Sequence, residues 1–354
     1  MDPTKIISAA RKCLIAEAAK PNARFIANDV LAMTDNQAVM EALATSDFPL
    51  LLADSSRTRL LQSFESEVGP LTTLLEPELV TDFADHKGVM VGNIGALHEM
   101  PDEMTAGMEY THLTESGKTF CVKGFGRRIA LTMKLLANDR LGSLAKVPAQ
   151  WGQVAAESLE AHLAIPFNTN REQDGTTHVW SVARANCGIL SLTEPNVATS
   201  IALLKAMTYT DADGTKRKIP CKKILMLVPD SLSDTAWKIW TATKYYPGAG
   251  GGIEYDPKEI WRNFGWSTPP ITVPDFSDTN CWFLVNASRP WFKKVLWTQA
   301  QQPVFLQKRP YWDGNVAGYP VDESMSVEWG CFFPYGFFVE EYRTIYAQDP
   351  DNPW

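Results

Sequence analysis

The cysteines and histidines are the residues of this chain best suited to bind a metal or to act as nucleophiles, and neither set has a ligand spacing. The six cysteines lie dozens of residues apart, without the paired spacing of a zinc site or a redox motif. We interpret them as small apolar groups of the core. His98-Glu99 begins like a zinc-protease helix, but Asp102 stands where the second histidine is required. The sequence predicts no metal site. The residues concerned are Cys13, Cys121, Cys187, Cys221, Cys281 and Cys331, and His86, His98, His112, His162 and His178.

Three short motifs begin like known binding loops and then depart from the pattern. The run from Gly124 to Ile129 opens like a dinucleotide-binding loop, but Ile129 replaces the third glycine and both flanks indicate strand. The run from Gly248 to Gly252 lacks the Lys-Ser/Thr of a phosphate-binding loop, so we predict a mobile loop tip. Asp211 to Gly214 begins like a calcium loop but has no closing glutamate, and we interpret it as a turn between a helix and a strand. No cofactor-binding residue is predicted.

The densest basic cluster combines Lys216-Arg217-Lys218 with Lys222-Lys223. Such a cluster is able to contact phosphate, but in a chain of net charge −8 a solvated turn before a strand is the favoured interpretation. No nucleophile lies on a recognisable sharp turn, and the spacing indicates no Ser-His-Asp or Cys-His arrangement. We therefore predict no catalytic residue, and we expect that the protein is not an enzyme.

The composition is that of a folded protein. The 354 residues, 45% of them hydrophobic, are enough for two average domains or one long domain with a buried core. The 41 acidic against 33 basic residues argue against wholesale wrapping by nucleic acid. No stretch approaches the ~20 apolar residues of a membrane span, and the run from Met1 to Lys5 lacks the order of a signal peptide. We expect a protein made and kept in a cytoplasm, without a membrane partner.

Helices are expected to dominate the first eighty residues. Asp2-Pro3 is a typical helix start, and Pro21 ends the helix that follows. A second helix is predicted from Asp35 to Ala44 and a third from Pro49 to about Phe64.

A long polar insert separates two β-rich runs, Val89 to Val91 and Thr119 to Val122. We call this insert, Ala96 to Gly117, the acidic segment, because it contains five acidic residues and no Lys or Arg. An irregular stretch longer than ~12–15 residues is uncommon inside a compact domain and is usually disordered or a working arm. Its apolar residues, Met100, Met104, Met108 and Tyr110, provide side chains that can dock. The acids are Glu99, Asp102, Glu103, Glu109 and Glu115, and the basic residues that follow are Lys118, Lys123, Arg127, Arg128 and Lys134.

The strongest helix pattern runs from about Asp139 to Ala164, and Pro148 is expected to bend or divide this helix. A further helix is predicted from Pro195 to Met207. The buried strand Lys223 to Val228 leads through a turn into a helix from Leu232 to about Thr243, a unit that indicates a small α/β domain.

The C-terminal part of the chain is rich in aromatic residues and is expected to be mostly strand. Trp282 to Val285 is predicted as a second buried strand. In the last sixty residues aromatic and polar positions alternate, around Val304 to Leu306, Ser326 to Trp329 and Phe337 to Val339. This alternation predicts long antiparallel strands.

Several motifs, taken in order, resemble those of one viral family. They are Thr45-Ser46-Asp47-Phe48-Pro49, Leu97-His98-Glu99-Met100-Pro101, Gly107-Met108-Glu109-Tyr110, the run from Gly126 through Arg128, Ile129, Leu131 and Thr132 to Leu135-Leu136-Ala137-Asn138-Asp139-Arg140-Leu141-Gly142, then Val147-Pro148, Gly152, Ala155-Ala156, Leu227-Val228-Pro229 and Trp282-Phe283-Leu284-Val285. Each motif alone is weak. Together they resemble the phage major capsid family of Mu-like and related siphophages, over roughly residues 45 to 346.

The resemblance implies an α+β protein with the Hong Kong 97-type capsid fold. In that fold residues 1–83 would be a mostly helical N-terminal arm and residues 84–122 the extended E-loop. Residues 123–210 would form the peripheral domain, with the spine helix at about 139–164, residues 211–292 the axial domain, and residues 293–354 the strands that complete the peripheral domain. The implied function is the major capsid protein of a tailed phage, which assembles as hexamers and pentamers into an icosahedral shell around double-stranded DNA.

The chain departs from the family pattern in two places. Pro166-Phe167-Asn168-Thr169-Asn170 follows the spine helix where relatives often have a Phe-His loop, and no long charged scaffolding region precedes residue 45. We therefore expect a separate scaffold protein or a short N-terminal substitute. The resemblance also implies a portal, a protease and a decoration protein as partners, and non-specific contact of the inner face with packaged DNA. The alternatives are an encapsulin-like compartment shell and an aromatic-rich cytoplasmic enzyme or sugar-binding protein.

Overall fold

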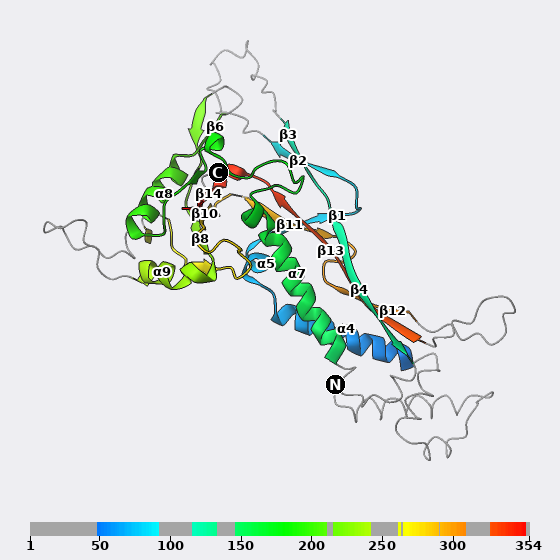
Figure 1. The fold of residues 1–354 in the computed structure, drawn as a ribbon. Helices are drawn as coiled ribbons and strands as arrows, with labels where there is room; N and C mark the ends of the chain where they lie inside the picture. Colours follow the sequence, from blue (N-terminus) through cyan, green and yellow to red (C-terminus); the bar gives the residue numbers. More distant parts are fainter. Residues whose placement is uncertain are drawn as a thin grey trace, which may run out of the picture. The chain divides into compact units, whose positions relative to one another are not determined.

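The computed structural model describes residues 48–91, 115–132, 146–210, 215–241, 261–262, 265–289, 291–308 and 326–351 (Figure 1). The chain divides into two compact units: unit 1 comprises residues 1–68, 124–158 and 298–334, and unit 2 comprises residues 69–123, 159–297 and 335–354. The mixture of helices and sheets confirms the predicted α+β class. The helices predicted before residue 47, most of the acidic segment and the loop Gly248 to Gly252 lie outside the described residues.

Unit 1 contains helix α4 (Phe48–Ser66), the first part of α7 (Val147–Thr169), and a sheet in which β4 (Lys123–Thr132) and β12 (Val304–Lys308) pair with the first part of β13 (Ser326–Val339). The helix predicted at residues 49–64 is confirmed as α4. Its described half buries Leu60 and Phe64, and the Phe64 ring meets Phe333 edge to face at 5.4 Å. Burial of this apolar face, rather than helix propensity, is what stabilises such a helix.

Gly152 sets the contact between α4 and α7. A Cβ atom at this position would lie 2.3 Å from the Leu60 carbonyl oxygen and 2.8 Å from the Phe64 backbone nitrogen. Only glycine lets the two helix backbones approach this closely. Pro148 is the second residue of α7, where a missing N–H group is tolerated, and residues 139–145 of the predicted helix lie outside the described residues.

Helix α7 continues beyond the predicted end at Ala164 to Thr169, with Pro166 inside its last turn. A proline inside a helix removes one backbone hydrogen bond, so the extra turn needs compensation. Phe167 provides it, since this side chain is 3% exposed and contacts the rings of Phe276 and Phe283. The sequence pattern missed this turn because these partners lie more than a hundred residues away.

Unit 2 begins with the short helix α5 (Pro70–Leu74) and strand β1 (Glu76–Val80), which pairs in parallel with β11 (Phe292–Trp297). Strand β11 pairs antiparallel with the last part of β13. Val295 and Phe338 from these strands pack against Phe120 at the end of the β2–β3 hairpin (His86–Val91 and Glu115–Phe120). Strand β1 was not predicted, whereas β11 lies at the start of the C-terminal region in which strands were expected.

A second, mixed sheet of unit 2 has the order β5-β14-β10-β8-β9. Its strands are β5 (Cys187–Gly188), β8 (Ile224–Val228), β9 (Ile271–Thr272), β10 (Trp282–Asn286) and β14 (Ile345–Gln348). Strands β8 and β10, both predicted, are buried at every position. Helices α8 (Glu194–Ala206) and α9 (Asp230–Thr241), also predicted, pack on this sheet (Figure 1).

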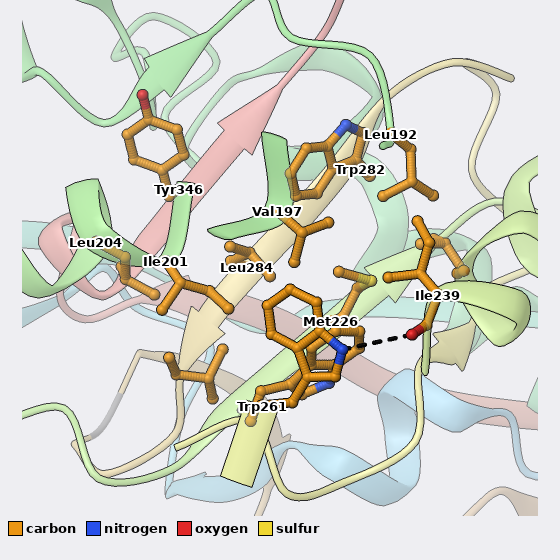
Figure 2. Close-up of a cluster of buried hydrophobic side chains, with 14 of the residues drawn as sticks. Leu192, Val197, Ile201, Leu204, Met226, Ile239, Trp261, Trp282, Leu284 and Tyr346 are labelled. Carbon is orange, nitrogen blue, oxygen red and sulfur yellow. Dashed lines mark hydrogen bonds between the residues drawn. The ribbon is translucent and has the colours of Figure 1, made fainter. Parts of the chain in front are cut away.

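One apolar cluster holds this sheet and its helices together (Figure 2). Figure 2 shows Val197 and Ile201 of α8 facing Leu284 of β10 and Met226 of β8. Trp261 is 2% exposed, and its indole N–H donates to the Ile239 carbonyl at 3.4 Å. Burial of large apolar side chains at about 25 cal/mol per Å² is the main stabilising contribution in such a core.

Two interpretations of the region before β8 were wrong. Asp211 to Gly214 lie outside the described residues, but the residues on either side form β6 (Thr208–Thr210) and β7 (Lys216–Lys218), an antiparallel pair, so this run follows a strand and not a helix. Lys216-Arg217-Lys218 forms strand β7 itself and is not a turn. Each of the three basic residues is paired with a residue of β6, and this antiparallel pairing keeps the run extended. Short 3-10 turns at Val182–Arg184 and Tyr342–Thr344 complete the described elements.

Candidate functional site

The acidic segment is rooted in unit 2 by the β2–β3 hairpin. Strand β2 pairs antiparallel with β3 from His86 opposite Phe120 to Val91 opposite Glu115. The two β-rich runs predicted on either side of the segment are thus confirmed as strands, and they are partners. The two ends of the acidic segment therefore leave unit 2 side by side.

A partly buried ion pair fixes the second strand of this hairpin. Lys118 Nζ lies 3.0 Å from Glu172 Oε1 and donates a second hydrogen bond to the Val339 carbonyl at 3.1 Å. The Lys118 and Glu172 side chains are 15% and 10% exposed. Arg184 approaches the same Glu172 oxygen at 3.4 Å and stacks its guanidinium 4.3 Å from the centre of the Tyr342 ring. Removing one member of such a group leaves a charge with little solvent around it.

The Gln173 side chain forms two hydrogen bonds with the backbone of Cys121, the residue after β3, as a neighbouring strand would. Its side-chain oxygen accepts from the Cys121 backbone N–H at 3.0 Å, and its amide nitrogen donates to the Cys121 carbonyl at 2.6 Å. Gly336 lies against the same peptide, since a Cβ there would be 2.4 Å from the Cys121 carbonyl oxygen. The base of the acidic segment therefore has a fixed position within unit 2.

The loop that carries Glu172 and Gln173 is itself closed by polar side chains. Asn170, with a left-handed φ of 52°, donates to the Trp180 carbonyl at 2.8 Å and accepts from the Trp180 N–H at 2.9 Å. Asn186 donates to the carbonyls of Val179 and Tyr342. Burial raises the pKa of Asp174, but the hydrogen bonds from Thr177 and Thr176 outweigh this effect and lower the pKa to about 2. We call residues 170–186 the anchoring loop.

Gln173→Ala is expected to loosen the base of the acidic segment without unfolding unit 2. The Cys121 N–H would lose its acceptor, so its hydrogen exchange should accelerate about tenfold or more, while the melting temperature changes little. Exchange of peptides covering residues 118–122, followed by mass spectrometry, measures this. Gln150→Ala, at an exposed position, is the matched control. Unchanged exchange at Cys121 would contradict the anchoring role.

The glycines of the dinucleotide-like motif have a packing role in β4. A Cβ at Gly126 would lie 2.9 Å from the Cys331 carbonyl oxygen, and one at Gly124 would lie 2.9 Å from the Phe332 ring. The motif therefore lies in strand β4, as the strand-like residues on either side of it predicted. Because Gly124 and Gly126 have no side chains, β4 can approach β13 closely.

An exposed shelf with cationic and apolar side chains lies on the sheet of unit 1. Arg128 of β4 and Leu306 of β12 flank Gly330 of β13, whose Cβ position would be 3.0 Å from Arg128 Cγ and 3.6 Å from Leu306 Cβ. Leu306 is 47% exposed, and Arg127 and Arg128 are both exposed. Arg128 also reaches Glu328 at 3.7 Å, and because the arginine side chain is 76% exposed this ion pair has little energetic weight. We call Arg128 and Leu306 the basic shelf; the side chain of Arg127, the preceding residue of β4, points to the opposite face of the sheet.

His162 of α7 is an uncharged histidine packed between aromatic rings. Its ring centroid lies 5.2 Å from that of Tyr335 and 5.4 Å from that of Phe337. Burial, together with the nearby charge of Lys123, lowers the pKa of His162 to about 4. The folded protein therefore keeps this ring neutral at pH values where the unfolded chain would protonate it.

We expect His162 to reduce stability in mild acid. The pKa of His162 in the folded protein lies below the unfolded value of about 6.5. The neutral ring therefore makes its full contribution to the free energy of unfolding above pH 6.5. As the pH falls towards 4, the free energy of unfolding decreases by at most about 3 kcal/mol because of this residue. His162→Phe should flatten the fall in the free energy of unfolding over this range, measured by urea titration at several pH values. The exposed His178→Gln variant is the control. Equal slopes for wild type and His162→Phe would refute the prediction.

Nucleophiles and cavities within the described residues offer no reactive arrangement. The five described cysteines are free, and burial raises the pKa of each thiol, for Cys331 to about 11, so they remain protonated. A cavity of about 530 Å³ is lined in part by Asp278. The Asp278 carboxylate already accepts a hydrogen bond from the backbone N–H of Asn280. In this part of the chain no three His, Cys, Asp or Glu residues are grouped to hold a metal ion. No helix described here is long and apolar enough to cross a membrane.

Comparison with known proteins places this architecture in a family. Solved structures that match this chain include a virus-like particle from Pyrococcus furiosus (8% identity, 84% of this chain and 98% of that chain covered, TM-score 0.46) and a chain of Mycobacterium phage Bobi (12%, 80% and 91%, TM-score 0.47). A chain of the satellite phage P4 procapsid, which includes the size determination protein, is 14% identical, with 83% and 90% covered and a TM-score of 0.44. No curated protein matches the sequence. A family model described as phage capsid protein matches residues 122–348, which is more than half of the chain and includes strands β4 to β14 and the anchoring loop. The chain belongs to the phage capsid protein family.

Proposed function

We propose that this protein is the major capsid protein of a tailed phage, and that it assembles as hexamers and pentamers into an icosahedral shell around double-stranded DNA. The family match over residues 122–348 carries the proposal, since it identifies a structural shell protein of the virion capsid. A closed shell requires heterologous contacts, in which a patch on one subunit meets a different patch on the next. The acidic segment and the basic shelf are two such unlike patches.

The parts of the chain have a place in this proposal. Residues 1–83 would form the N-terminal arm, 84–122 the E-loop, 123–210 the peripheral domain, 211–292 the axial domain and 293–354 the closing strands. The fixed position of Lys118 and Cys121 supports the E-loop role, because an arm that reaches a neighbour needs a rigid root to set its direction.

The acidic segment of one subunit would lie on the basic shelf of a neighbour. The segment carries acids interleaved with methionines and a tyrosine, and the shelf offers Arg128 beside the exposed Leu306. Charge complementarity would select the partner and the register, and the apolar contact would add affinity. A portal, a scaffold, a protease and a decoration protein would be partners during assembly in the host cytoplasm.

Electron microscopy of the purified full-length protein tests the proposal. Closed icosahedral particles built from five- and six-membered capsomers are expected. Small soluble particles alone would overturn it in favour of the cytoplasmic enzyme. Neighbouring genes separate the remaining alternative, because terminase, portal and protease genes accompany a phage capsid, whereas a peroxidase or ferritin-like cargo gene accompanies an encapsulin-like shell.

We predict that the subunits are not joined by lysine cross-links from the acidic segment. The segment contains no lysine, and Lys118 at its root is bound to Glu172 and to the Val339 carbonyl. A lysine held in this way is poorly placed to react with another subunit. Denaturing gels of mature particles should show the monomer, and a ladder of multiples of the monomer mass would contradict the prediction.

A further inference from the structure

A glutamate of the same subunit lies beside the arginine of the basic shelf. Glu328 Oε2 of β13 is 3.7 Å from the Arg128 guanidinium of β4. Glu328 and Gly330 lie on the same face of β13, because successive strand residues alternate. Gly330 is the residue that Arg128 and Leu306 flank. Three neighbouring strands thus place a cation, an anion and an exposed apolar side chain on one face of the sheet.

Packing on the opposite face of β13 fixes the direction of the Glu328 side chain. Trp329 is 4% exposed, and its ring lies 5.8 Å from that of Phe305. Phe305 in turn lies 6.1 Å from Trp151 of α7. Because Trp329 is buried on this side of the sheet, the preceding residue, Glu328, points to the shelf. Glu328 therefore stays beside Arg128 in the free subunit.

The Arg128–Glu328 pair is loose compared with the ion pair at the root of the acidic segment. There, Lys118 Nζ lies 3.0 Å from the Glu172 carboxylate, and both side chains are largely buried. The separation of 3.7 Å between Arg128 and Glu328 is longer than the ~2.7–2.9 Å of a charge-assisted hydrogen bond, and Arg128 is well exposed. Such a pair contributes little stability, so another carboxylate can replace Glu328 at small cost.

We propose that Glu328 is a competitor built into the basic shelf, which occupies Arg128 until the acidic segment of a neighbouring subunit displaces it. The inference rests on the proposed contact between segment and shelf. An incoming carboxylate approaches Arg128 against the like charge of Glu328, so the acidic residues alone gain little. Apolar side chains placed on Leu306 add a contact that Glu328 does not oppose.

The competition sets a threshold for the partner. Glu328 weakens the binding of every carboxylate to Arg128, so a partner that offers charge alone stays weakly bound. The acidic segment offers both kinds of contact, with three methionines and Tyr110 among its five acids. Glu328 therefore lowers the affinity of the shelf and restricts it to segments of this composition.

The alternative role of Glu328 is to stabilise its own sheet by balancing the charge of Arg128. In that role, Glu328→Gln would lower the melting temperature and leave the binding of the segment unchanged. The long separation and the exposure of Arg128 favour the competitor, because they make the pair a weak source of stability.

The test measures binding of two fluorescent peptides to the purified full-length protein, kept below the concentration at which it assembles. One peptide has the natural sequence of residues 96–117, and the other, the serine peptide, carries Met100→Ser, Met104→Ser, Met108→Ser and Tyr110→Ser. The protein variants are Glu328→Gln, Arg128→Gln and the two combined. Glu157→Gln, at an exposed position of unit 1, makes the same change in charge and is the matched control.

Glu328→Gln should bind both peptides about three- to tenfold more tightly than the wild type, with a melting temperature within about 2 °C of it. Arg128→Gln should weaken binding about fivefold or more, and adding Glu328→Gln to it should restore less than about twofold. The control should change binding by less than about twofold. The wild type should bind the serine peptide at least about tenfold more weakly than the natural one.

Unchanged or weaker binding by Glu328→Gln overturns the inference, and so does an equal gain in Glu157→Gln. A gain that persists in full without Arg128 shows that Glu328 does not compete for it, and equal binding of the two peptides by the wild type removes the threshold. Shells are scored separately by microscopy. Wild-type shells together with any of these results reject this inference alone, whereas the absence of shells rejects the proposed function.

Discussion

Glu160→Ala should remove about 3–5 kcal/mol from the free energy of unfolding. Glu160 of α7 is 4% exposed, and its two carboxylate oxygens accept from the backbone N–H of Leu71 at 2.6 Å and from the N–H and hydroxyl of Thr72 at 2.9 and 2.8 Å. These bonds cap the first turn of α5. Alanine would leave the buried donors without an acceptor, and each such donor costs about 1–3 kcal/mol.

Tight packing around Glu160 is the reason why the expected loss in the free energy of unfolding is large. A Cβ at Gly69 would lie 2.3 Å from Glu160 Cδ, so the chain closes tightly over the carboxylate. Lys294 donates to the Thr72 carbonyl at 2.7 Å, and its pKa is lowered by burial, which the charge of Glu160 opposes. Glu160→Ala would therefore also remove the carboxylate that favours the charged form of Lys294.

Urea unfolding of the unassembled protein measures the loss. Glu160→Gln keeps one acceptor oxygen and should lose about half as much as Glu160→Ala. Glu157→Ala, on the exposed side of the same helix, should change the free energy by no more than about 0.5 kcal/mol. A loss below about 1 kcal/mol for Glu160→Ala would refute the capping role.

The sequence correctly predicted the helices and strands whose apolar residues follow a clear helical or strand pattern. The uninterrupted apolar run of β8 and the helical spacing of α8 and α9 indicated elements that the structure confirms within a few residues. The family resemblance, which rests on motifs in order, is confirmed by the match over residues 122–348. Strand β1 (Glu76-Pro77-Glu78-Leu79-Val80) was missed, because it is mostly exposed and lacks a clear period of two.

The anchoring contacts could not be read from the sequence. Gln173 meets Cys121 across 52 residues and Glu160 meets Leu71 across 89, and neither side chain belongs to a motif. Polar residues of this kind look like ordinary surface residues until the fold brings a backbone N–H beside them. The Gly124-Phe125-Gly126 run shows the opposite case, in which a conspicuous pattern has a purely steric role against β13.

The acidic segment and the basic stretch after it were both evident in the sequence, but the sequence left open whether the basic residues merely balance charge within their own hairpin. Arg128 does approach Glu328 at 3.7 Å, but the arginine is well exposed to solvent, so this ion pair accounts for little stability. The exposed Leu306 beside Arg128 is the structural feature that makes this surface suited to a segment with both acids and methionines.

Arg127→Glu combined with Arg128→Glu should therefore abolish shell formation while leaving folded capsomers or monomers with a melting temperature near that of the wild type. Like charges across an interface cost several kcal/mol, enough to prevent closure of a shell that repeats the contact in every subunit. Sedimentation and electron microscopy measure the loss, and Lys146→Glu with Lys238→Glu, at exposed positions with the same change in charge, should assemble normally. Adding Glu103→Lys and Glu109→Lys to the double arginine variant should restore particles by exchanging the charges. Normal shells from the double arginine variant would refute the contact, and an unfolded variant would show that the two arginines serve their own subunit instead.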